Sequence, residues 1–220
     1  MSRSAAGAYF DVDGTLTPLT TMFELLLFDA QSSGRLSEGQ GFLKGLRQAK
    51  DAGAPRESTN RAYFRWWAGR SVDEVRELGH TWFSSLQEED LVFPGMQRRL
   101  EWHRRQQHRI VLVSGSFEPA LAPLAGYLRV DDVLTTSAIV DGGQYTGDIT
   151  APMIGEGKAV AVAEHAARHR LDLAASHGYG DDISDVPFLD LLGTRVLVSA
   201  AELQLPNPAP GWSTRVLAET

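Results

Sequence analysis

The hydrophobic positions divide the chain into segments of two textures. Between residues 17 and 91, apolar residues recur at helical spacing and are separated by breaks rich in Gly and Ser. This spacing places apolar side chains along one stripe of each helix. The block is therefore predicted to be a bundle of several short helices, carried by the stretches FELLLFDA, GFLKGLRQAK, STNRAYFRWWAG and VDEVRELGHTWFSSL.

Outside this block, short apolar runs alternate with helical stretches. Residues 8–12 form a run that ends in acids, Gly and Thr, which is typical of a buried strand leading into a functional loop. Further strands are predicted at RIVLVSGS, ASHGYGDD and TRVLVS, with helices between them and a hairpin at AIVDGGQYTGDI. Such alternation predicts an α/β fold, a Rossmann-like parallel sheet covered by helices on both faces. The helical block would be an insertion over residues 17–91, and the core would combine residues 1–16 with 92–220.

The composition excludes some classes of binding partner and some kinds of catalysis. Apolar residues make up 43% of the chain, which is enough for a packed core. The formal net charge of −7 argues against nucleic acid or an anionic membrane as a partner, and it means that any phosphate site needs local positive charge. The absence of cysteine excludes disulfides and thiolate catalysis. No stretch resembles a signal peptide or a membrane span, so the expected location is the cytoplasm.

Four predicted strand or helix ends carry polar groups. Two acids, Asp11 and Asp13, flank Val12 and precede Gly14 after the first strand. The others are Ser114-Gly115-Ser116 after a second strand, Lys158 at the start of a helix, and Gly180-Asp181-Asp182 followed by Asp185. Ligands of open parallel sheets bind beyond the carboxyl ends of the strands, so these groups are predicted to meet.

Bringing these acids together has an electrostatic consequence. Asp11, Asp13, Asp181, Asp182 and Asp185 would form a dense carboxylate cluster, which is costly without a cation. Hard oxygen ligands at this density suit Mg²⁺. With the ammonium group of Lys158, such a metal would stabilise a phosphoryl group in transfer.

Each motif also has a simpler interpretation. An Asp-Gly pair after a strand is often only a turn, Ser114 could cap the following helix, and an isolated lysine is usually on the surface. Asp182 is predicted to cap a helix that begins near Ile183, with a place close to the metal as the alternative.

The four motifs together resemble the haloacid dehalogenase-like (HAD) superfamily. The matching segments are Asp11 to Thr17, Val113-Ser114-Gly115, Lys158, and Gly180-Asp181-Asp182 with Asp185, in the family's order and over nearly the whole chain. The chain is similar in particular to the phosphoserine-phosphatase-like branch, in which a small helical cap follows the first strand. The resemblance therefore implies a phosphatase whose cap is the helical insertion.

The resemblance also implies a role for each matched residue. Asp11 would be the nucleophile that forms an aspartyl-phosphate, and Asp13 would be the general acid and base. Mg²⁺ would be held by the Asp11 carboxylate, the Asp13 carbonyl and Asp181, with Asp185 orienting the metal or its waters. The phosphoryl oxygens would contact Ser114, Lys158 and the backbone N–H groups near Gly14 and Gly115.

The resemblance leaves the substrate open. Phosphoserine phosphatases of this branch carry a Glu where this chain has Thr20, and Glu24 lies about one helical turn later. We therefore expect a different small phosphorylated metabolite, with phosphoserine as the alternative substrate. A phosphomutase and a non-catalytic phosphometabolite-binding relative are the alternative functions. The cap is expected to open and close about hinges near Thr17-Pro18 and Phe93-Pro94-Gly95, and the oligomeric state is left open.

Two further groups invite functional explanations that we do not adopt. The aromatic residues Tyr63, Phe64, Trp66 and Trp67 stand at helical spacing and are predicted to fill mainly the core of the insertion. The basic stretch from His103 to Arg109 is predicted to be a solvated helix face. No catalytic role is assigned to the remaining histidines His165, His169 and His177, whose spacing suggests no metal site.

Overall fold

The computed structural model describes residues 5–86, 91–199 and 212–216. Its main sheet has the strand order β3-β2-β1-β6-β7-β8, and every pair of neighbouring strands is parallel. The strands are β1 (Gly7–Phe10), β2 (Arg109–Ser114), β3 (Asp132–Thr135), β6 (His177–Gly180), β7 (Thr194–Ser199) and β8 (Trp212–Val216). The strand order reverses at β1, so the ends of β1, β2 and β6 meet where such sheets bind ligands.

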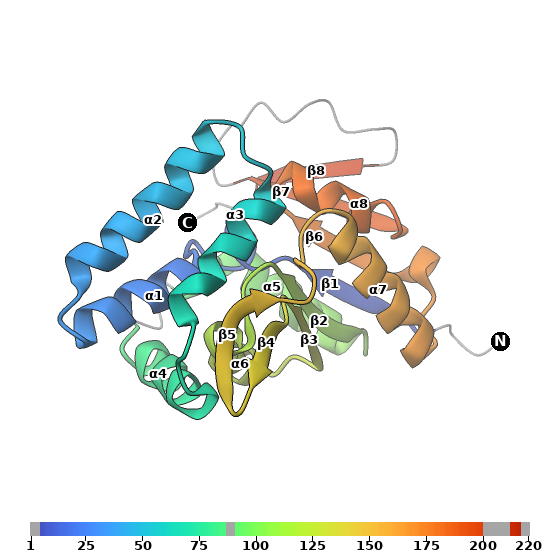
Figure 1. Cartoon of the computed structure of the whole chain (residues 1–220). Coiled ribbons are helices and arrows are strands. Elements are labelled where there is room, and N and C mark those ends of the chain that lie inside the picture. Colours follow the sequence, from blue (N-terminus) through green and yellow to red (C-terminus); the bar gives the residue numbers. More distant parts are fainter. Residues whose placement is uncertain (1–4, 87–90, 200–211, 217–220) are drawn as a thin grey trace.

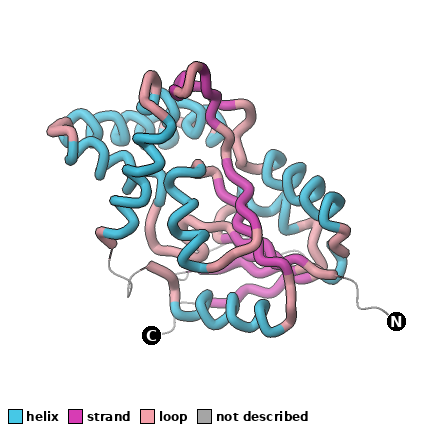
Figure 2. The backbone as a smooth tube through the Cα atoms, turned by 90° about the horizontal axis from the view of Figure 1, so that it is seen from below, coloured by secondary structure: helices cyan, strands magenta, loops and turns pink. Residues whose placement is uncertain are grey.

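Helices cover both faces of this sheet, as predicted (Figures 1 and 2). Side chains of β1 alternate between the faces: Phe10 belongs to the apolar core beneath α5 (Pro94–Arg105) and α6 (Glu118–Leu128), whereas Tyr9 faces the opposite side. That opposite core lies beneath α7 (Glu156–His169) and α8 (Val186–Leu189). Two short 3₁₀ helices, η3 (Leu173–Ala175) and η4 (Ile183–Asp185), flank β6.

The segment after β1 is helical, as its pattern predicts. It contains α1 (Thr21–Ser32), α2 (Leu36–Asp51), α3 (Arg56–Tyr63), the 3₁₀ helix η1 (Phe64–Trp67) and α4 (Val72–Ser84), which gather on one side of the sheet (Figure 1). The predicted hairpin is also present as β4 (Ala138–Asp141) and β5 (Gln144–Ile149), and β5 packs against η1.

The aromatic run fills the core of this segment, which confirms its structural interpretation. Tyr63, Phe64 and Trp67 are 0%, 1% and 0% exposed and belong to one apolar cluster with residues of α1 and the hairpin. Their rings also contact Phe117 from the start of α6. Trp66 is half-buried and donates its indole N–H to Asp29 over 2.9 Å.

The prediction for the basic stretch was wrong in part. His103 is fully buried on α5, with its ring nitrogens 2.9 Å from the Tyr179 hydroxyl and 2.8 Å from His108. Arg109 opens β2 and pairs with Asp132. One helix face cannot hold the whole stretch, because the helix ends at Arg105 and strand β2 begins at Arg109.

None of the helices in the described part of the chain is both long and apolar enough to cross a membrane.

Candidate active site

The loop after β1 presents Asp11 and Asp13 at the carboxyl edge of the sheet. The backbone N–H groups of Leu16 and Thr17 both donate to the Val12 carbonyl, over 2.8 and 3.1 Å, so the loop folds back tightly on itself. Gly14 has φ +84°, a conformation that disfavours side chains, which explains glycine at this point. The Asp13 carboxylate accepts the Thr21 N–H over 3.0 Å and is fixed against the start of α1.

Lys158 joins the first motif to the last. Its ammonium nitrogen lies 2.5 Å from Asp11 Oδ1 and 2.6 Å from Asp185 Oδ1, and its side chain is 5% exposed. Gly155, with φ +55°, precedes the helix on which Lys158 stands. A surface lysine would not be buried between two carboxylates, so the simpler interpretation of Lys158 does not hold.

Asp11, Asp181 and Asp185 converge on one point. Carboxylate oxygens of these three residues lie within 4.8 Å of one another. Thr15 donates its hydroxyl to Asp181 over 2.9 Å. A Cβ on Gly14 would lie 2.4 Å from Asp181 Oδ2, so only glycine leaves room for this carboxylate.

Burial and mutual repulsion raise the pKa values of the clustered acids, so added positive charge would favour their ionised forms. Burial, and then Asp11, raises the pKa of Asp13 to about 7, and the same two causes raise the pKa of Asp185 to about 6. Burial also raises the pKa of Asp11 and of Asp181 above the usual value, although Lys158 acts in the opposite direction on Asp11. A hard divalent cation fits such a set of buried oxygen donors.

The loop after β2 faces the same point. Ser114 is buried and accepts the Ser116 N–H on its hydroxyl oxygen over 3.1 Å, so its own proton can be donated to a ligand. The Gly115 carbonyl accepts hydrogen bonds from Asn60 of α3 and from the Thr136 hydroxyl, over 2.8 and 3.0 Å. The helical segment thereby contacts the loop directly.

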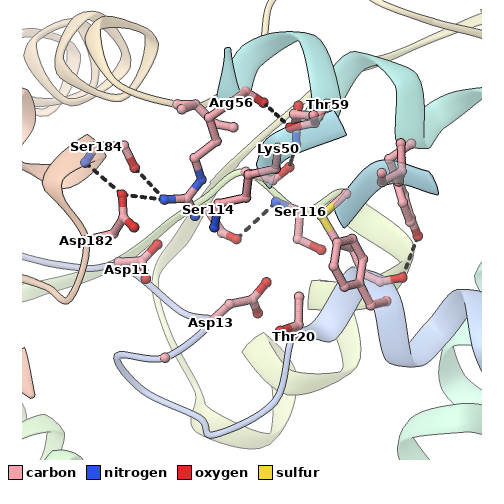
Figure 3. A pocket seen from close by; sticks show the side chains of 18 of the residues that line it. Asp11, Asp13, Thr20, Lys50, Arg56, Thr59, Ser114, Ser116, Asp182 and Ser184 are labelled. Carbon is pink, nitrogen blue, oxygen red and sulfur yellow. Dashed lines mark hydrogen bonds and ion pairs between the residues drawn. The ribbon is translucent and has the colours of Figure 1, made fainter. Parts of the chain in front are cut away.

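A cavity of about 560 Å³ opens above these residues and is closed on its far side by α1, α2 and α3. Figure 3 shows Lys50 and Arg56 on the opposite side of the cavity from Asp13 and Thr20. Thr20 lines the cavity, whereas Glu24 does not. The cavity brings every predicted site residue except Asp185 into its lining, and Asp185 lies just behind, against Lys158.

Asp182 caps a helix, as predicted. Its carboxylate accepts the Ser184 N–H over 2.9 Å, and the Asp185 carboxylate accepts the Asp182 N–H over 3.1 Å, which completes a capping box on η4. Arg56 of α3 forms an ion pair with the Asp182 carboxylate. Sequence reasoning missed Arg56 and Asn60, because no local pattern marks which polar residues of a helix will face a distant loop.

The histidines that received no catalytic role lie away from these carboxylates. His165 lies between the Tyr9 hydroxyl and the Asp132 carboxylate, each 3.1 Å from a ring nitrogen, and His169 stands one turn further along α7. Ligand atoms of Asp132, His165 and His169 lie within 4.8 Å of one another. The spacing of the histidines alone could not reveal this group, because Asp132 begins β3, a strand that the sequence pattern did not predict.

Comparison with known proteins places the chain in a family. The family model for haloacid dehalogenase-like hydrolases matches residues 8–190, so the chain belongs to the HAD family of hydrolases.

Several relatives come from Mycobacterium tuberculosis. A protein described as a probable phosphatase is 32% identical over 146 residues, which cover 66% of this chain and 50% of the relative. Phosphoserine phosphatase SerB1 is 29% identical over 219 residues, covering 96% of this chain and 70% of the relative. The chain thus spans about half the length of the first of these curated relatives.

Solved structures share the fold. A protein of unknown function from Bordetella pertussis Tohama I aligns with a TM-score of 0.82 at 23% identity, covering 98% of this chain and 100% of that protein. A substrate-bound phosphoserine phosphatase aligns with a TM-score of 0.64 at 18% identity, covering 90% of this chain and 87% of the other.

Proposed function

We propose that this protein is a Mg²⁺-dependent phosphatase that hydrolyses a small phosphomonoester through an aspartyl-phosphate on Asp11. The observation that carries the proposal is the placement of Lys158 between Asp11 and Asp185, beside Asp181 and below a cavity. Two carboxylates on one ammonium group leave a deficit of positive charge, which a bound metal cation would fill while it also neutralises an incoming phosphoryl group.

The residues divide the work of the first step. A carboxylate oxygen of Asp11 attacks phosphorus, and the bond from phosphorus to the leaving alcohol breaks. Asp13, held by the Thr21 N–H, gives a proton to the alcohol oxygen. Ser114 donates its hydroxyl to a phosphoryl oxygen, Lys158 neutralises charge beside Asp11, and backbone N–H groups near Gly14 and Gly115 add donors.

In the second step Asp13 takes a proton from a water molecule, whose oxygen attacks the phosphorus. The bond from phosphorus to Asp11 breaks, and inorganic phosphate leaves. Mg²⁺, held by the Asp11 carboxylate, the Asp13 carbonyl and Asp181 with Asp185 behind them, would neutralise the charge on the transferring group. Asp13 can serve as acid and base in turn because burial and Asp11 raise its pKa to about 7.

The proposed substrate is small because the cavity is roofed by helices. The volume of about 560 Å³ suits a metabolite. Residues 17–91 would form the cap, and residues 1–16 and 92–220 the catalytic core. Phosphoserine is the alternative substrate, favoured by the relative named phosphoserine phosphatase. Thr20, which lines the cavity without a negative charge, favours a substrate other than an amino acid.

The test is phosphate release from a panel of phosphomonoesters, with Mg²⁺ and with chelator, for the native protein and Asp11→Asn. We expect metal-dependent turnover that the substitution abolishes. The best substrate of the panel would give the substrate class. Turnover that survives in Asp11→Asn would contradict the proposed nucleophile.

A further inference from the structure

Helix α3 of the helical segment forms polar contacts with two loops of the core and with the end of strand β5. At its first residue, the Arg56 guanidinium group pairs with the Asp182 carboxylate and donates to the Ser184 hydroxyl over 2.9 Å. One turn later, Asn60 donates to the Gly115 carbonyl over 2.8 Å, and Arg61 donates to the Ile149 carbonyl over 2.9 Å. The Asn60 and Arg56 contacts fall on the two loops that carry Ser114 and the acids Asp181 and Asp185.

The Arg56 contact leads directly to the acid cluster. Its partner Asp182 caps η4 through the Ser184 N–H, and the Asp185 carboxylate accepts the N–H groups of both Asp181 and Asp182 over 3.1 Å. Asp185 in turn accepts Lys158 over 2.6 Å. A continuous set of polar contacts therefore joins a helix above the cavity to the residues proposed to hold the metal.

Another helix of the helical segment, which does not line the cavity, is fixed more firmly to the core. Helix α4 packs on α6 so closely that a Cβ on Gly79 would lie 2.0 Å from the Pro119 carbonyl oxygen. The Arg56 contact differs, since the side chains of Arg56 and Asp182 are 45% and 36% exposed. Exposed ion pairs contribute little stability, so this contact can form and break reversibly.

We propose that Arg56 is a positioning residue that latches α3 onto the loop of Asp181 to Asp185, so that closure over the cavity orders the metal site. The proposal rests on the proposed function for its catalytic consequence, but its structural part stands apart from turnover. Opening would separate Arg56 from Asp182 while α4 stays on α6. Metal binding and closure would then favour each other, as linkage requires.

Two substitutions test the latch, which is the ion pair between Arg56 and Asp182. Arg56→Gln removes the guanidinium charge from an exposed side chain. Asp182→Asn removes the carboxylate charge but keeps a good helix cap, so that η4 is retained. Arg65→Gln is the matched control, because Arg65 is an exposed arginine of the neighbouring η1 with no ion pair among the described residues.

The first readout is the distance between α2 and α7. Since the chain lacks cysteine, spin labels can be placed at the exposed positions Lys44 and Glu164 through Lys44→Cys and Glu164→Cys. We expect Arg56→Gln and Asp182→Asn each to broaden the distance distribution toward longer values, the double variant to match the single ones, and Arg65→Gln to leave it unchanged. An unchanged distribution in both single variants would overturn the latch, as would effects that simply add.

The second readout is Mg²⁺ affinity, measured by calorimetry without substrate. We expect both variants to weaken binding about three- to tenfold, and the control to match the native protein. Native affinity in both variants would overturn the coupling of closure to the metal site. Neither readout requires turnover, so failure of the proposed phosphatase activity would leave both interpretable. With an active substrate, kcat/KM should fall by a similar factor.

Discussion

The side chain of Lys158 links two loops of the candidate active site. Its ammonium group is buried between Asp11 and Asp185, and although burial disfavours its charge, the two carboxylates raise its pKa overall. The sequence alone predicted that Asp11, Asp13, Lys158 and Asp181 lie together, because their order and spacing form a pattern, and the structure places all four around one cavity. It could not identify Arg56 or Asn60, since their role depends on how a distant helix lies over the site.

At the residue scale, Gly14→Ala should weaken metal binding, because it adds one Cβ atom beside Asp181. A residue other than glycine at φ +84° lowers the stability of the fold by about 1–2 kcal/mol, and the new Cβ would also lie 2.4 Å from Asp181 Oδ2. The control Gly53→Ala has φ +89° and no atom within 4 Å of its Cβ. Urea unfolding should show a similar loss of stability for both, whereas calorimetry should show weaker Mg²⁺ binding only for Gly14→Ala. Equal Mg²⁺ affinities would contradict this account of Gly14.

At the element scale, the hydrophobic pattern predicted most helices and strands, because a helix buries one apolar stripe and a central strand is buried on both faces. It did not predict β3 and β8. The four residues of β3 are all half-buried, so they show no clean alternation. The basic stretch was misjudged for a related reason: His103 carries a polar side chain, but it stands on the buried face of α5 and is satisfied by Tyr179 and His108.

The buried carboxylate of Asp29 on α1 joins the elements of the helical segment. It accepts hydrogen bonds from the Trp66 indole over 2.9 Å and from Arg70 over 2.7 Å, and it pairs with Arg35 at 3.5 Å. Arg35 lies in the connection between α1 and α2, Trp66 lies in η1, and Arg70 lies in the connection between η1 and α4. Asp29 of α1 therefore holds together the start of α2 and the segment around η1, which belong to the helical segment beside the cavity.

Asp29→Asn should accordingly loosen this part of the molecule. The amide cannot accept from all three donors as the carboxylate does, so we expect a loss of roughly 1–3 kcal/mol in the free energy of unfolding. Hydrogen exchange should rise in α2 and α3 more than in β1 and β2. Arg65→Gln again serves as the control, with no expected change. An increase in the exchange rate that is equal throughout the chain would show that Asp29 does not act locally.

At the scale of the whole molecule, acid should destabilise the fold through buried histidine. Burial, then the neighbours His177 and His108, lowers the pKa of His103 to about 2, and burial lowers that of His177 to about 4. Folded His103 thus resists a proton that the unfolded chain takes up near pH 6.5. Its contribution to stability is complete above that pH and is lost as the pH falls below it, by about 1.4 kcal/mol per pH unit for His103.

This prediction is checked by urea unfolding between pH 7.5 and 5. The raised pKa values of Asp13 and Asp185 act in the opposite direction over this range, so the effect of His103 is measured as a difference. The native protein should be more stable than His103→Asn at neutral pH, and this difference should shrink as the pH falls below about 6.5. A profile that is equally steep in the variant would assign the acid sensitivity to other groups.

The central claim is that Asp11 carries the phosphoryl group between two half-reactions. The most direct measurement is mass spectrometry of the protein quenched in acid during turnover of its best panel substrate with Mg²⁺. We predict a phosphoryl group on the peptide that contains Asp11, absent when chelator replaces Mg²⁺ and absent in Asp11→Asn. A protein that turns the substrate over with no phosphoryl group on Asp11, or with one on another residue, would contradict the account.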